Sequence, residues 1–544
     1  MISRTNYVPL IARADRHRGA TAVIDSEGSL TYNDLLDASS RVASSLLAGR
    51  QDLHEERVAF LVTPAFPWVA VQWGIWRAGG VAVPLPLNST RRELDYFIED
   101  TEASTLVFDG PAESLLAPIA AERGAEFGIQ EPGVRSQKSG VRIIAMRKDG
   151  HIATTTPLPR ALACDQVLTC QPAELPEITS ERRAMILYTS GTTSRPKGVV
   201  TTHANITAQI VSLVEAWEWS GDDRILLCLP LHHVHGIINV VSCALWSGAA
   251  CEMLPRFDAN AVWERVSRGG VTLFMAVPTV YVKLIAAWDA ASPERRAALR
   301  QACGKLRLMV SGSAALPVST LERWKEISGH TLLERYGMTE IGMALSNPVR
   351  GVRVPGSVGT PLPGVEVQLV DEDGKLVAAG TPGEIEVRGP SVFAEYWGQP
   401  EATRLAFRDG WFRTGDTAVV ENGVYRILGR TNLDILKTGA HKVSALEIEE
   451  ALRAHPSVAE CAVVGVPDPE WGERVAAALV LNAGSALDLA SLRAWAKEFL
   501  ATHKLPSRLL VLDALPRNAM GKVMKPAIAA MFQTAGGGDA AAQD

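Results

Sequence analysis

The sequence predicts an α/β protein: a large N-terminal domain of doubly wound parallel sheets plus a β-rich subdomain, and a small α+β C-terminal domain. Three observations support this prediction. Short apolar runs alternate with helical patterns over most of the chain, which is typical of parallel strands covered by helices on both faces. Strand patterns then follow one another from about residue 356. Beyond residue 430, helix and strand patterns mix again over roughly 100 residues, enough for a separate core.

The composition limits the functions that are compatible with the chain. It has 544 residues, 47% of them hydrophobic, and a net charge of −6, so it can build several cores and has no general attraction for nucleic acid. Its seven cysteines include no C-x-x-C pair, and we expect reduced cysteines in a cytoplasmic protein rather than disulfides or a zinc site. The basic start (Arg4, Arg13, Arg16 and Arg18) leaves a mitochondrial transit segment as the alternative. The apolar stretch 237–254 is interrupted by polar residues, so we expect no membrane span.

The first 110 residues alternate strands with helices. We expect a hairpin over 20–31, followed by a helix that Thr31 and Asp34 begin with a capping box. The next expected elements are strand 57–62, helix 66–78, strand 81–84, helix 91–100 and strand 105–108. Residues 110–180 lack a clear pattern, and we expect insertions and surface connections there. Because open parallel sheets bind ligands beyond the carboxyl ends of their strands, the loops at those ends are the candidate sites.

A loop rich in glycine and hydroxyl residues follows the apolar strand 184–187. It ends at Lys197 and contains Thr189, Ser190, Gly191, Thr192, Thr193 and Ser194. Glycine lets successive N–H groups turn toward one anion, the hydroxyls add donors, and the lysine adds a mobile charge. The loop therefore predicts a cradle for a triphosphate, although the Walker spacing G-x-x-x-x-G-K-[ST] is absent.

Later strands also end in small or polar residues. Strand 224–229 leads into Pro230-Leu-His-His-Val-His-Gly236, and strand 271–277 leads into Pro278-Thr279. Strand 306–310 leads into Ser311-Gly-Ser-Ala-Ala-Leu-Pro317, and strand 331–333 leads into Glu334-Arg-Tyr-Gly-Met-Thr-Glu340. We expect these ends to form one floor for one ligand. His232, His233 and His235 have no acidic or cysteine partner nearby, so we interpret them as packing and hydrogen-bonding residues rather than metal ligands.

The β-rich part ends in two further motifs, Trp411-Phe-Arg-Thr-Gly-Asp416 and Leu428-Gly-Arg430. Asp416 can accept hydrogen bonds from ribose hydroxyls and Arg430 can donate to them; alternatively the two form a surface salt bridge. We expect domain bounds of 1–430 and 431–530 and a flexible tail over 531–544.

Together these motifs resemble the adenylate-forming enzymes, which include acyl-CoA synthetases, beetle luciferases and peptide-synthetase adenylation domains. The resemblance covers about residues 20–530 and departs from the usual pattern at Ser194, Ala440 and the expected hinge residue Asn432. It implies two half-reactions. A carboxylate attacks the α-phosphate of ATP and releases pyrophosphate, and the thiol of coenzyme A then attacks the acyl-AMP. It also implies that the small domain is mobile and rotates about a hinge just after Arg430.

The resemblance implies a role for each motif. Phosphate binding is implied for Thr189, Ser190, Gly191, Thr192, Thr193 and Lys197. Contacts to the adenine, the α-phosphate and the ribose are implied for Ser313, Ala314, Tyr336, Gly337, Thr339, Asp416 and Arg430. Glu340 and Thr189 would hold Mg²⁺, Lys522 would be the catalytic lysine, and Lys437 and Gly439 would reach the thiol tunnel. The histidine loop would border the acyl pocket through His233, which we group with the catalytic residues, and His235.

Within the superfamily the motifs most resemble malonyl-CoA synthetases, on the segments 230–237, 306–317, 334–342 and 437–447. A dicarboxylic acid brings a second negative charge into the acyl pocket, and burying it unpaired is costly, so a cation must meet it. We expect Arg307, on a strand face with Met309 and Ser311, to hold that carboxylate, unless it pairs with a structural acid.

Met338 would lie beside the α-carbon of the acid and limit its bulk, with room left for methylmalonate. The predicted small molecules are therefore malonate, ATP, Mg²⁺ and coenzyme A. Three other readings stay open: a short- or medium-chain fatty acyl-CoA synthetase, an adenylation module that charges a carrier protein, and a nucleotide-binding protein without catalysis. No carrier domain follows residue 530, which disfavours the carrier module. The sequence does not determine the oligomeric state.

Overall fold

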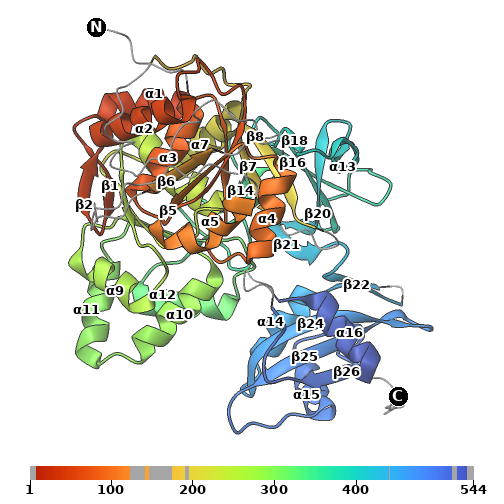
Figure 1. Cartoon of the computed structure of the whole chain (residues 1–544). Coiled ribbons are helices and arrows are strands. Elements are labelled where there is room, and N and C mark those ends of the chain that lie inside the picture. The colour runs from red at the N-terminus through yellow and green to blue at the C-terminus, as the bar shows by residue number, and fades with distance from the viewer. Residues whose placement is uncertain are drawn as a thin grey trace.

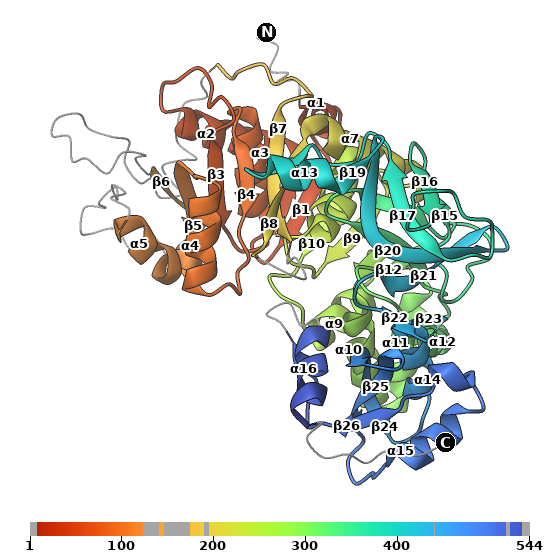
Figure 2. The same ribbon diagram turned by 90° about the vertical axis from the view of Figure 1, so that its right-hand side faces the viewer.

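The computed structural model describes residues 8–122, 141–145, 174–189, 195–439, 441–517 and 523–535. A large domain, coloured from red to cyan in Figure 1, carries three sheets, and a smaller blue domain carries a fourth. Figure 2 shows the small domain below the large one, with the β-rich part to one side. The predicted α/β class and the division into one large and one small folded unit are confirmed.

The first sheet holds the strands on which most of the expected site residues lie. Its order is β15 (Thr360–Pro361), β14 (Gly342–Ser346), β13 (Leu333–Met338), β12 (Leu308–Ser311), β11 (Leu273–Ala276), β9 (Arg224–Leu227), β10 (Ala250–Met253), β1 (Thr21–Asp25) and β2 (Gly28–Thr31). The six strands from β13 to β1 are parallel, and the edge pairs are antiparallel. The carboxyl ends of β9, β11, β12 and β13 therefore meet at one edge, as the sequence predicts.

The second sheet carries the phosphate-loop strands. Its order is β18 (Glu395–Tyr396), β8 (Lys197–Thr202), β7 (Arg183–Thr189), β4 (Val81–Pro84), β3 (Arg57–Leu61), β5 (Thr105–Asp109) and β6 (Val141–Ala145). The strands β7, β4, β3 and β5 are parallel. The strand β8 returns antiparallel to β7, so the loop between them is the tip of a hairpin.

Helices cover both faces of both sheets. They are α1 (Pro9–Ala14), α2 (Tyr32–Leu47), α3 (Phe66–Arg77), α4 (Arg91–Asp100), α5 (Glu113–Glu122), α7 (His203–Ala216), the π-helix η3 (His235–Ser242), α8 (Cys243–Ser247), α9 (Ala259–Arg268), α10 (Pro278–Asp289), α11 (Pro293–Cys303) and α12 (Val318–Ser328). The capping box at the start of α2 is confirmed: Asp34 N donates to Thr31 Oγ1 (3.2 Å) and Thr31 N donates to Asp34 Oδ2 (2.8 Å).

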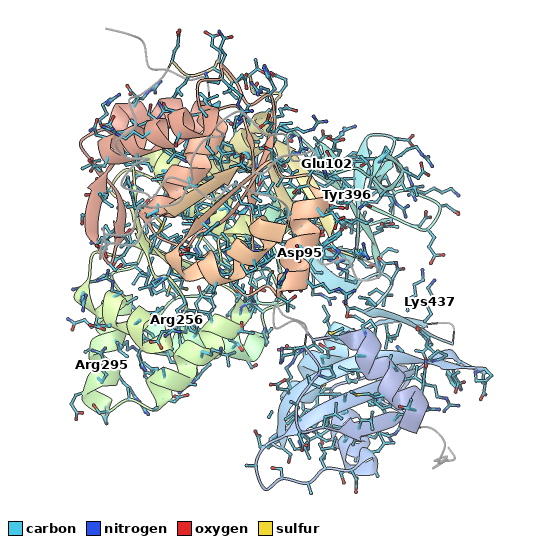
Figure 3. All side chains as sticks on the ribbon, viewed as in Figure 1. Asp95, Glu102, Arg256, Arg295, Tyr396 and Lys437 are labelled. Atoms are coloured by element: carbon cyan, nitrogen blue, oxygen red, sulfur yellow. The ribbon has the colours of Figure 1, made fainter. Side chains whose placement is uncertain are left out.

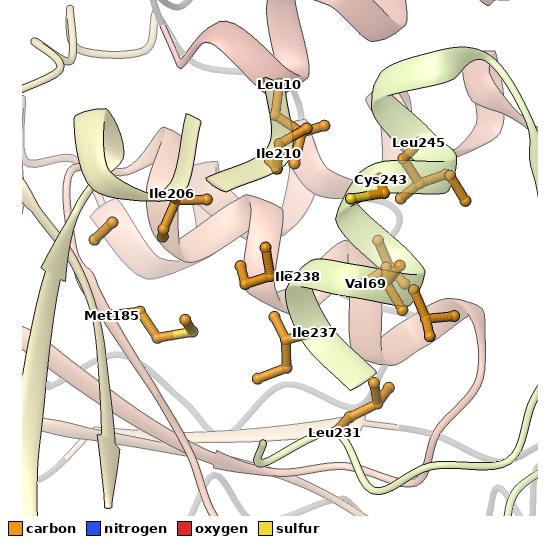
Figure 4. Packing of buried hydrophobic residues seen from close by; sticks show 14 of the residues in the cluster. Leu10, Val69, Met185, Ile206, Ile210, Leu231, Ile237, Ile238, Cys243 and Leu245 are labelled. Carbon is orange, nitrogen blue, oxygen red and sulfur yellow. The ribbon is translucent and has the colours of Figure 1, made fainter. Parts of the chain in front are cut away.

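The largest core lies between the two sheets. It joins one face of each sheet to α2, α3, α7, η3 and α8. Figure 4 shows Ile237 and Ile238 of η3 among Met185 of β7, Val69 of α3 and Ile206 of α7. A second core lies under α9 to α12 on the other face of the first sheet, and a third lies under α4 and α5. Because successive strand residues point to opposite faces, this doubly covered arrangement explains the nearly continuous apolar strands.

The β-rich subdomain is a twisted antiparallel sheet. It contains β16 (Glu366–Val370), β17 (Gly383–Arg388), β19 (Phe407–Arg408), β20 (Trp411–Glu421) and β21 (Val424–Arg430), with α13 (Pro400–Ala406) before β19. β21 ends at Arg430, and the next strand along the chain, β22, belongs to the small domain's sheet.

The small domain has two cores of its own. Its strands are β22 (Ile435–Thr438), β23 (His441–Ser444), β24 (Val458–Asp468), β25 (Gly472–Leu481) and β26 (Arg508–Val511), and its helices are α14 (Ala445–Arg453), α15 (Leu489–Ala496) and α16 (Lys525–Ala535). The tail predicted over 531–544 is wrong at its beginning, because α16 continues to Ala535 and Phe532 is buried in the core beneath it. Burial of the apolar Phe532 side chain on the inner face of α16 stabilises the end of this helix, although small, flexible residues follow it.

Two further expectations need correction. The motif that begins at Glu334 is not a loop: β13 continues through Met338 and pairs with the returning strand β14. Within the poorly patterned stretch, α5 and β6 are regular elements. Among the described residues, five cysteines are buried and carry no disulfide. None of the helices in the described ranges combines the length and apolar character that crossing a membrane requires.

Candidate active site

Two residues mark the mouth of the phosphate loop. Thr189 ends β7 and Lys197 begins β8, and the two are paired in the hairpin register. The predicted phosphate-binding residues between them, Ser190, Gly191, Thr192 and Thr193, lie outside the described residues. The ammonium of Lys197 lies 4.8 Å from the ring centre of Tyr396, a cation–π contact that directs the lysine toward β18.

Tyr396 links this lysine to Glu340. Its hydroxyl donates to Glu340 Oε1 over 3.0 Å. Glu340 follows Thr339 in the turn between β13 and β14 and is only 5% exposed, and burial raises its pKa. Its Oε2 atom is buried and has no hydrogen-bond partner among the described residues.

The unpartnered oxygen of Glu340 fits a magnesium ion. A buried acceptor without a donor is costly unless a cation or water completes it. Magnesium prefers one or two carboxylates and takes its other ligands from phosphates and water. The described residues contain no group of three or more histidine, cysteine or acidic side chains that could hold a metal alone, so phosphate oxygens would have to complete the set.

The expected ribose residues lie on neighbouring strands. Asp416 of β20 and Arg430 of β21 are register partners, and Arg430 Nε lies 3.1 Å from Asp416 Oδ1. The hydroxyl of Tyr336, on β13, donates to the other carboxylate oxygen over 2.6 Å. Burial raises the pKa of Asp416, although Arg430 and Tyr336 act against that rise. The fold therefore brings these three predicted nucleotide residues together from three strands.

A second cluster of side chains forms at the same edge of the first sheet. It comes from the segments that follow β9 and β12 and from β13 itself. Ser313 follows β12 with a φ of 69°, a strained conformation for a residue with a side chain. Its Oγ lies 3.3 Å from His235 Nδ1 and 3.3 Å from Arg335 Nη2. His235 is the first residue of the π-helix η3 and is 3% exposed, and burial lowers its pKa well below the usual value, so the ring is neutral.

Arg335 is the residue of this cluster that the sequence reasoning missed. It is 3% exposed, burial lowers its pKa to about 9, and its Nε atom has no hydrogen-bond partner within the described residues. A Cβ atom on Gly312 would lie 2.6 Å from the guanidinium carbon, so a side chain at residue 312 would force the guanidinium to shift. The available signal was the charged pair Glu334 and Arg335, which follows the apolar pair Leu332 and Leu333 within a strand pattern.

Arg307 does not lie in the site, and its predicted role is wrong. The strand β12 begins one residue later, so Arg307 lies at the amino end of that strand, roughly 13 Å of chain from the carboxyl end. Its Nε and Nη2 atoms donate to the two oxygens of Asp223, each over 2.7 Å, and its Nη1 atom donates to the carbonyl of Trp217 (3.0 Å). The guanidinium is thus held by a structural acid.

Four of the remaining predicted residues lie at three places on the large domain. Met338 and Gly337 lie at the end of β13, where a Cβ on Gly337 would approach the carbonyl oxygen of Gly342 to 2.1 Å, which makes glycine necessary. His233 lies in the loop before η3, its ring centre 4.1 Å from that of His232. Ala314 is exposed beside Ser313.

The predicted lid residues lie on the small domain. Lys437 contacts Glu372 (3.4 Å) and Glu473, and Gly439, at the tip of the β22–β23 hairpin, donates its N–H to the Trp471 carbonyl. Figure 3 shows Tyr396 on the large domain and Lys437 on the β22–β23 hairpin of the small domain. None of the contacts of Lys437 within the described chain reaches the nucleotide residues. Lys522 lies outside the described residues.

Comparison with known proteins found matching family models, relatives and solved structures. The family described as "AMP-binding enzyme" matches residues 10–397, and the "AMP-binding enzyme C-terminal domain" matches residues 447–522. The chain is 46% identical to the mitochondrial malonate–CoA ligase ACSF3 of Mus musculus, over 95% of this chain and 89% of that one. It is 41% identical to the malonate–CoA ligase of Arabidopsis thaliana, over 88% and 78% of the two chains. The ATP-bound structure of MatB from Rhodopseudomonas palustris superposes with a TM-score of 0.83 at 34% identity, covering 97% of this chain and 99% of MatB.

Proposed function

This chain belongs to the AMP-binding enzyme family, and on that premise we propose that it is an AMP-forming acid–CoA ligase that joins malonate to coenzyme A. The observation that carries the proposal is the meeting of Tyr336, Asp416 and Arg430 at the edge where Glu340 and Lys197 also lie. These groups supply what a nucleotide triphosphate needs: hydroxyl contacts, an acidic group for a cation, and a lysine for phosphate. The choice of malonate is supported by relatives that carry this activity in their names.

In the first half-reaction a carboxylate oxygen of the acid attacks the α-phosphorus of ATP, and the bond to the β-phosphate oxygen breaks. Asp416 and Arg430 would hold the ribose, so the α-phosphate is oriented toward the acid. Thr339 would donate to the α-phosphate, and Thr189, Lys197 and the loop between them would bind the leaving pyrophosphate. A magnesium ion on Glu340 would neutralise part of the phosphate charge.

In the second half-reaction the thiol of coenzyme A attacks the acyl carbon, and AMP leaves. We assign residues 1–430 to the adenylation domain and 431–530 to a lid that changes its orientation between the steps. Lys522 would stabilise the charge that develops on the phosphate during adenylation. The hairpin with Lys437 and Gly439 would approach the thiol when the lid turns.

We propose the cytoplasm as the compartment and keep the mitochondrial matrix as the alternative, since the mouse and human relatives are named mitochondrial. Two of the N-terminal arginines belong to the folded domain: Arg13 donates to the Trp246 carbonyl, and Arg18 pairs with Asp15. Cell fractionation with an antibody to the native protein distinguishes the two compartments.

A panel of acids tests the proposed activity. The purified protein is incubated with ATP, Mg²⁺ and malonate, methylmalonate or butyrate, and ATP–pyrophosphate exchange and AMP release with free coenzyme A are measured. We expect malonate to give the highest kcat/KM and to require coenzyme A for continuous AMP release. A higher kcat/KM with butyrate would support a fatty acyl-CoA synthetase instead. Exchange without any use of free coenzyme A would support a carrier-protein module.

A further inference from the structure

We propose that Tyr396 is a positioning residue that makes the nucleotide site selective for Mg²⁺ over Ca²⁺. Its hydroxyl occupies one oxygen of Glu340, so a cation can use only the other oxygen, and its ring keeps Lys197 apart from that carboxylate. This inference rests on the proposed ligase activity, in which Glu340 holds the cation and Lys197 binds phosphate.

The first argument concerns the two oxygens of the Glu340 carboxylate. The hydroxyl of Tyr396 donates to Oε1 over 3.0 Å, whereas Oε2 is buried and has no partner among the described residues. Burial and the neighbouring carboxylate raise the pKa of Tyr396, so the hydroxyl keeps its proton and remains a donor. An arriving cation therefore meets one available oxygen rather than two.

A single available carboxylate oxygen suits Mg²⁺ better than Ca²⁺. Magnesium demands near-octahedral geometry at about 2.0–2.1 Å and binds one or two carboxylates, with water and phosphates as its other ligands. Calcium takes about six to eight oxygens at roughly 2.3–2.6 Å and accepts a carboxylate through one or both oxygens. The hydrogen bond to Oε1 thus removes the two-oxygen mode that the larger ion could use.

The second argument concerns the ring of Tyr396. Lys197 Nζ lies 4.8 Å from the ring centre, and within the described chain no acidic residue forms an ion pair with this lysine. The attraction to the ring face holds the ammonium without neutralising it. Glu340 is bound at the hydroxyl end of the same side chain, so the tyrosine separates two opposite charges. A direct ion pair between them would leave neither charge available to Mg²⁺ or to phosphate.

Tyr396 can act in this way because its backbone is fixed on both sides. It is the second residue of β18 and is the register partner of Val199 on β8. Its N–H donates to Thr403 Oγ1 over 3.0 Å, and the residue is only 8% exposed. Phe393, three residues earlier, donates its N–H to the Glu340 carbonyl over 2.7 Å. The same short segment therefore holds Glu340 at its backbone and at its carboxylate.

The test measures nucleotide binding by Tyr396→Phe, which removes the hydroxyl and keeps the ring. Calorimetry gives the Kd of α,β-methylene-ATP, whose α–β linkage resists cleavage, in excess Mg²⁺, in excess Ca²⁺ and in EDTA. We expect the Kd with Mg²⁺ to rise about tenfold, and the Kd values with Ca²⁺ and in EDTA to change less than about threefold. The matched control is Tyr32→Phe, which removes a buried hydroxyl that donates to the Ala249 carbonyl over 2.7 Å and should leave all three values unchanged.

Tyr396→Leu removes the ring as well as the hydroxyl. Lys197 and Glu340 can then pair directly, so the lysine is withdrawn from the phosphates. We expect the Kd to rise about 100-fold with Mg²⁺ and at least about tenfold in EDTA, where Tyr396→Phe shows little change. A Kd in EDTA no higher than that of Tyr396→Phe overturns the proposed separation of charges by the ring.

Failure of this inference differs from failure of the proposed function. If the unmodified protein releases no AMP with any acid, the proposed function falls, and the binding measurements still decide the role of Tyr396. The inference is overturned if Tyr396→Phe raises the Kd equally in Mg²⁺, Ca²⁺ and EDTA, which a merely structural hydroxyl would do. It is also overturned if the unmodified protein binds the analogue equally with both cations, or if Tyr396→Phe keeps the full preference for Mg²⁺. Where Tyr396→Leu does not fold, the three Kd values of Tyr396→Phe decide alone.

Discussion

Replacing Arg307 with methionine is expected to destabilise the large domain and to leave the choice of acid unchanged. The substitution removes both hydrogen bonds to Asp223, whose side chain is only 3% exposed, and leaves that carboxylate buried beside an apolar chain. The Asp223 carboxylate still accepts hydrogen bonds from Ser220 N (2.9 Å) and Thr272 Oγ1 (2.8 Å), so part of the stabilisation of its charge is kept.

The structure sets the size of this effect. Breaking a buried ion pair costs about 3–5 kcal/mol. The side chain of Arg307 is 32% exposed, so water can reach the gap, and we expect about 3 kcal/mol, the lower end of that range. With an unfolding entropy of ~2.1 cal/mol/K per residue, a domain of roughly 430 residues has ~0.9 kcal/mol/K, and Tm should fall by about 3 °C.

Calorimetry and a double-mutant cycle measure this effect. Asp223→Asn alone should cost less, because it leaves a partly exposed guanidinium rather than a buried charge. The double variant should cost less than the sum of the single ones by about 1–3 kcal/mol. A Tm within 1 °C of the unmodified protein, together with a selective loss of malonate turnover, would refute the structural role of Arg307.

The same pair predicts a pH dependence. Burial alone would raise the pKa of Asp223, but the hydrogen bonds from Arg307, Ser220 and Thr272 outweigh it and hold the pKa below its ordinary value of 3.8. The stabilisation is therefore present above about pH 4 and is lost as the pH falls through the folded-state pKa. In Arg307→Met the folded-state pKa of Asp223 should rise toward its unfolded value, so Tm should fall less below about pH 4 than in the unmodified protein.

Three further outcomes follow from the lid and the ribose site. Lys522→Ala should slow ATP–pyrophosphate exchange by several decades while thioester formation from added malonyl-AMP falls far less, and an equal loss in both steps would argue against a role confined to adenylation. Asp416→Ala should raise the KM for ATP at least tenfold and change the KM for malonate little; the reverse pattern would contradict the ribose assignment. Lys525→Met should leave the buried carboxylates of Asp434 and Glu449 without their shared cation, and hydrogen exchange should increase in the small domain first, whereas unchanged protection would contradict the pairing.

Much of the fold could be predicted because it depends on local physics. The capping box at Thr31, the apolar strands and the helices between them follow from side-chain periodicity and backbone sterics over a few residues. The order of the motifs likewise indicated the ligand edge, since the carboxyl ends of parallel strands must meet. Asp416 and Arg430 were named from the sequence, and the structure joins them as register partners.

What the tertiary structure decided was which charged side chain lies unpaired in the interior. Arg307 and Arg335 both lie in strand patterns with apolar residues close before them, and alternation along a strand does not show where the strand begins. Arg307 meets Asp223, 84 residues away along the chain, because β12 begins one residue after it, whereas Arg335 is enclosed between β12 and η3 beside a glycine. The partner of a charge is set by segments distant in the chain, and the cost of burial depends on that partner, so neither can be read from the local sequence.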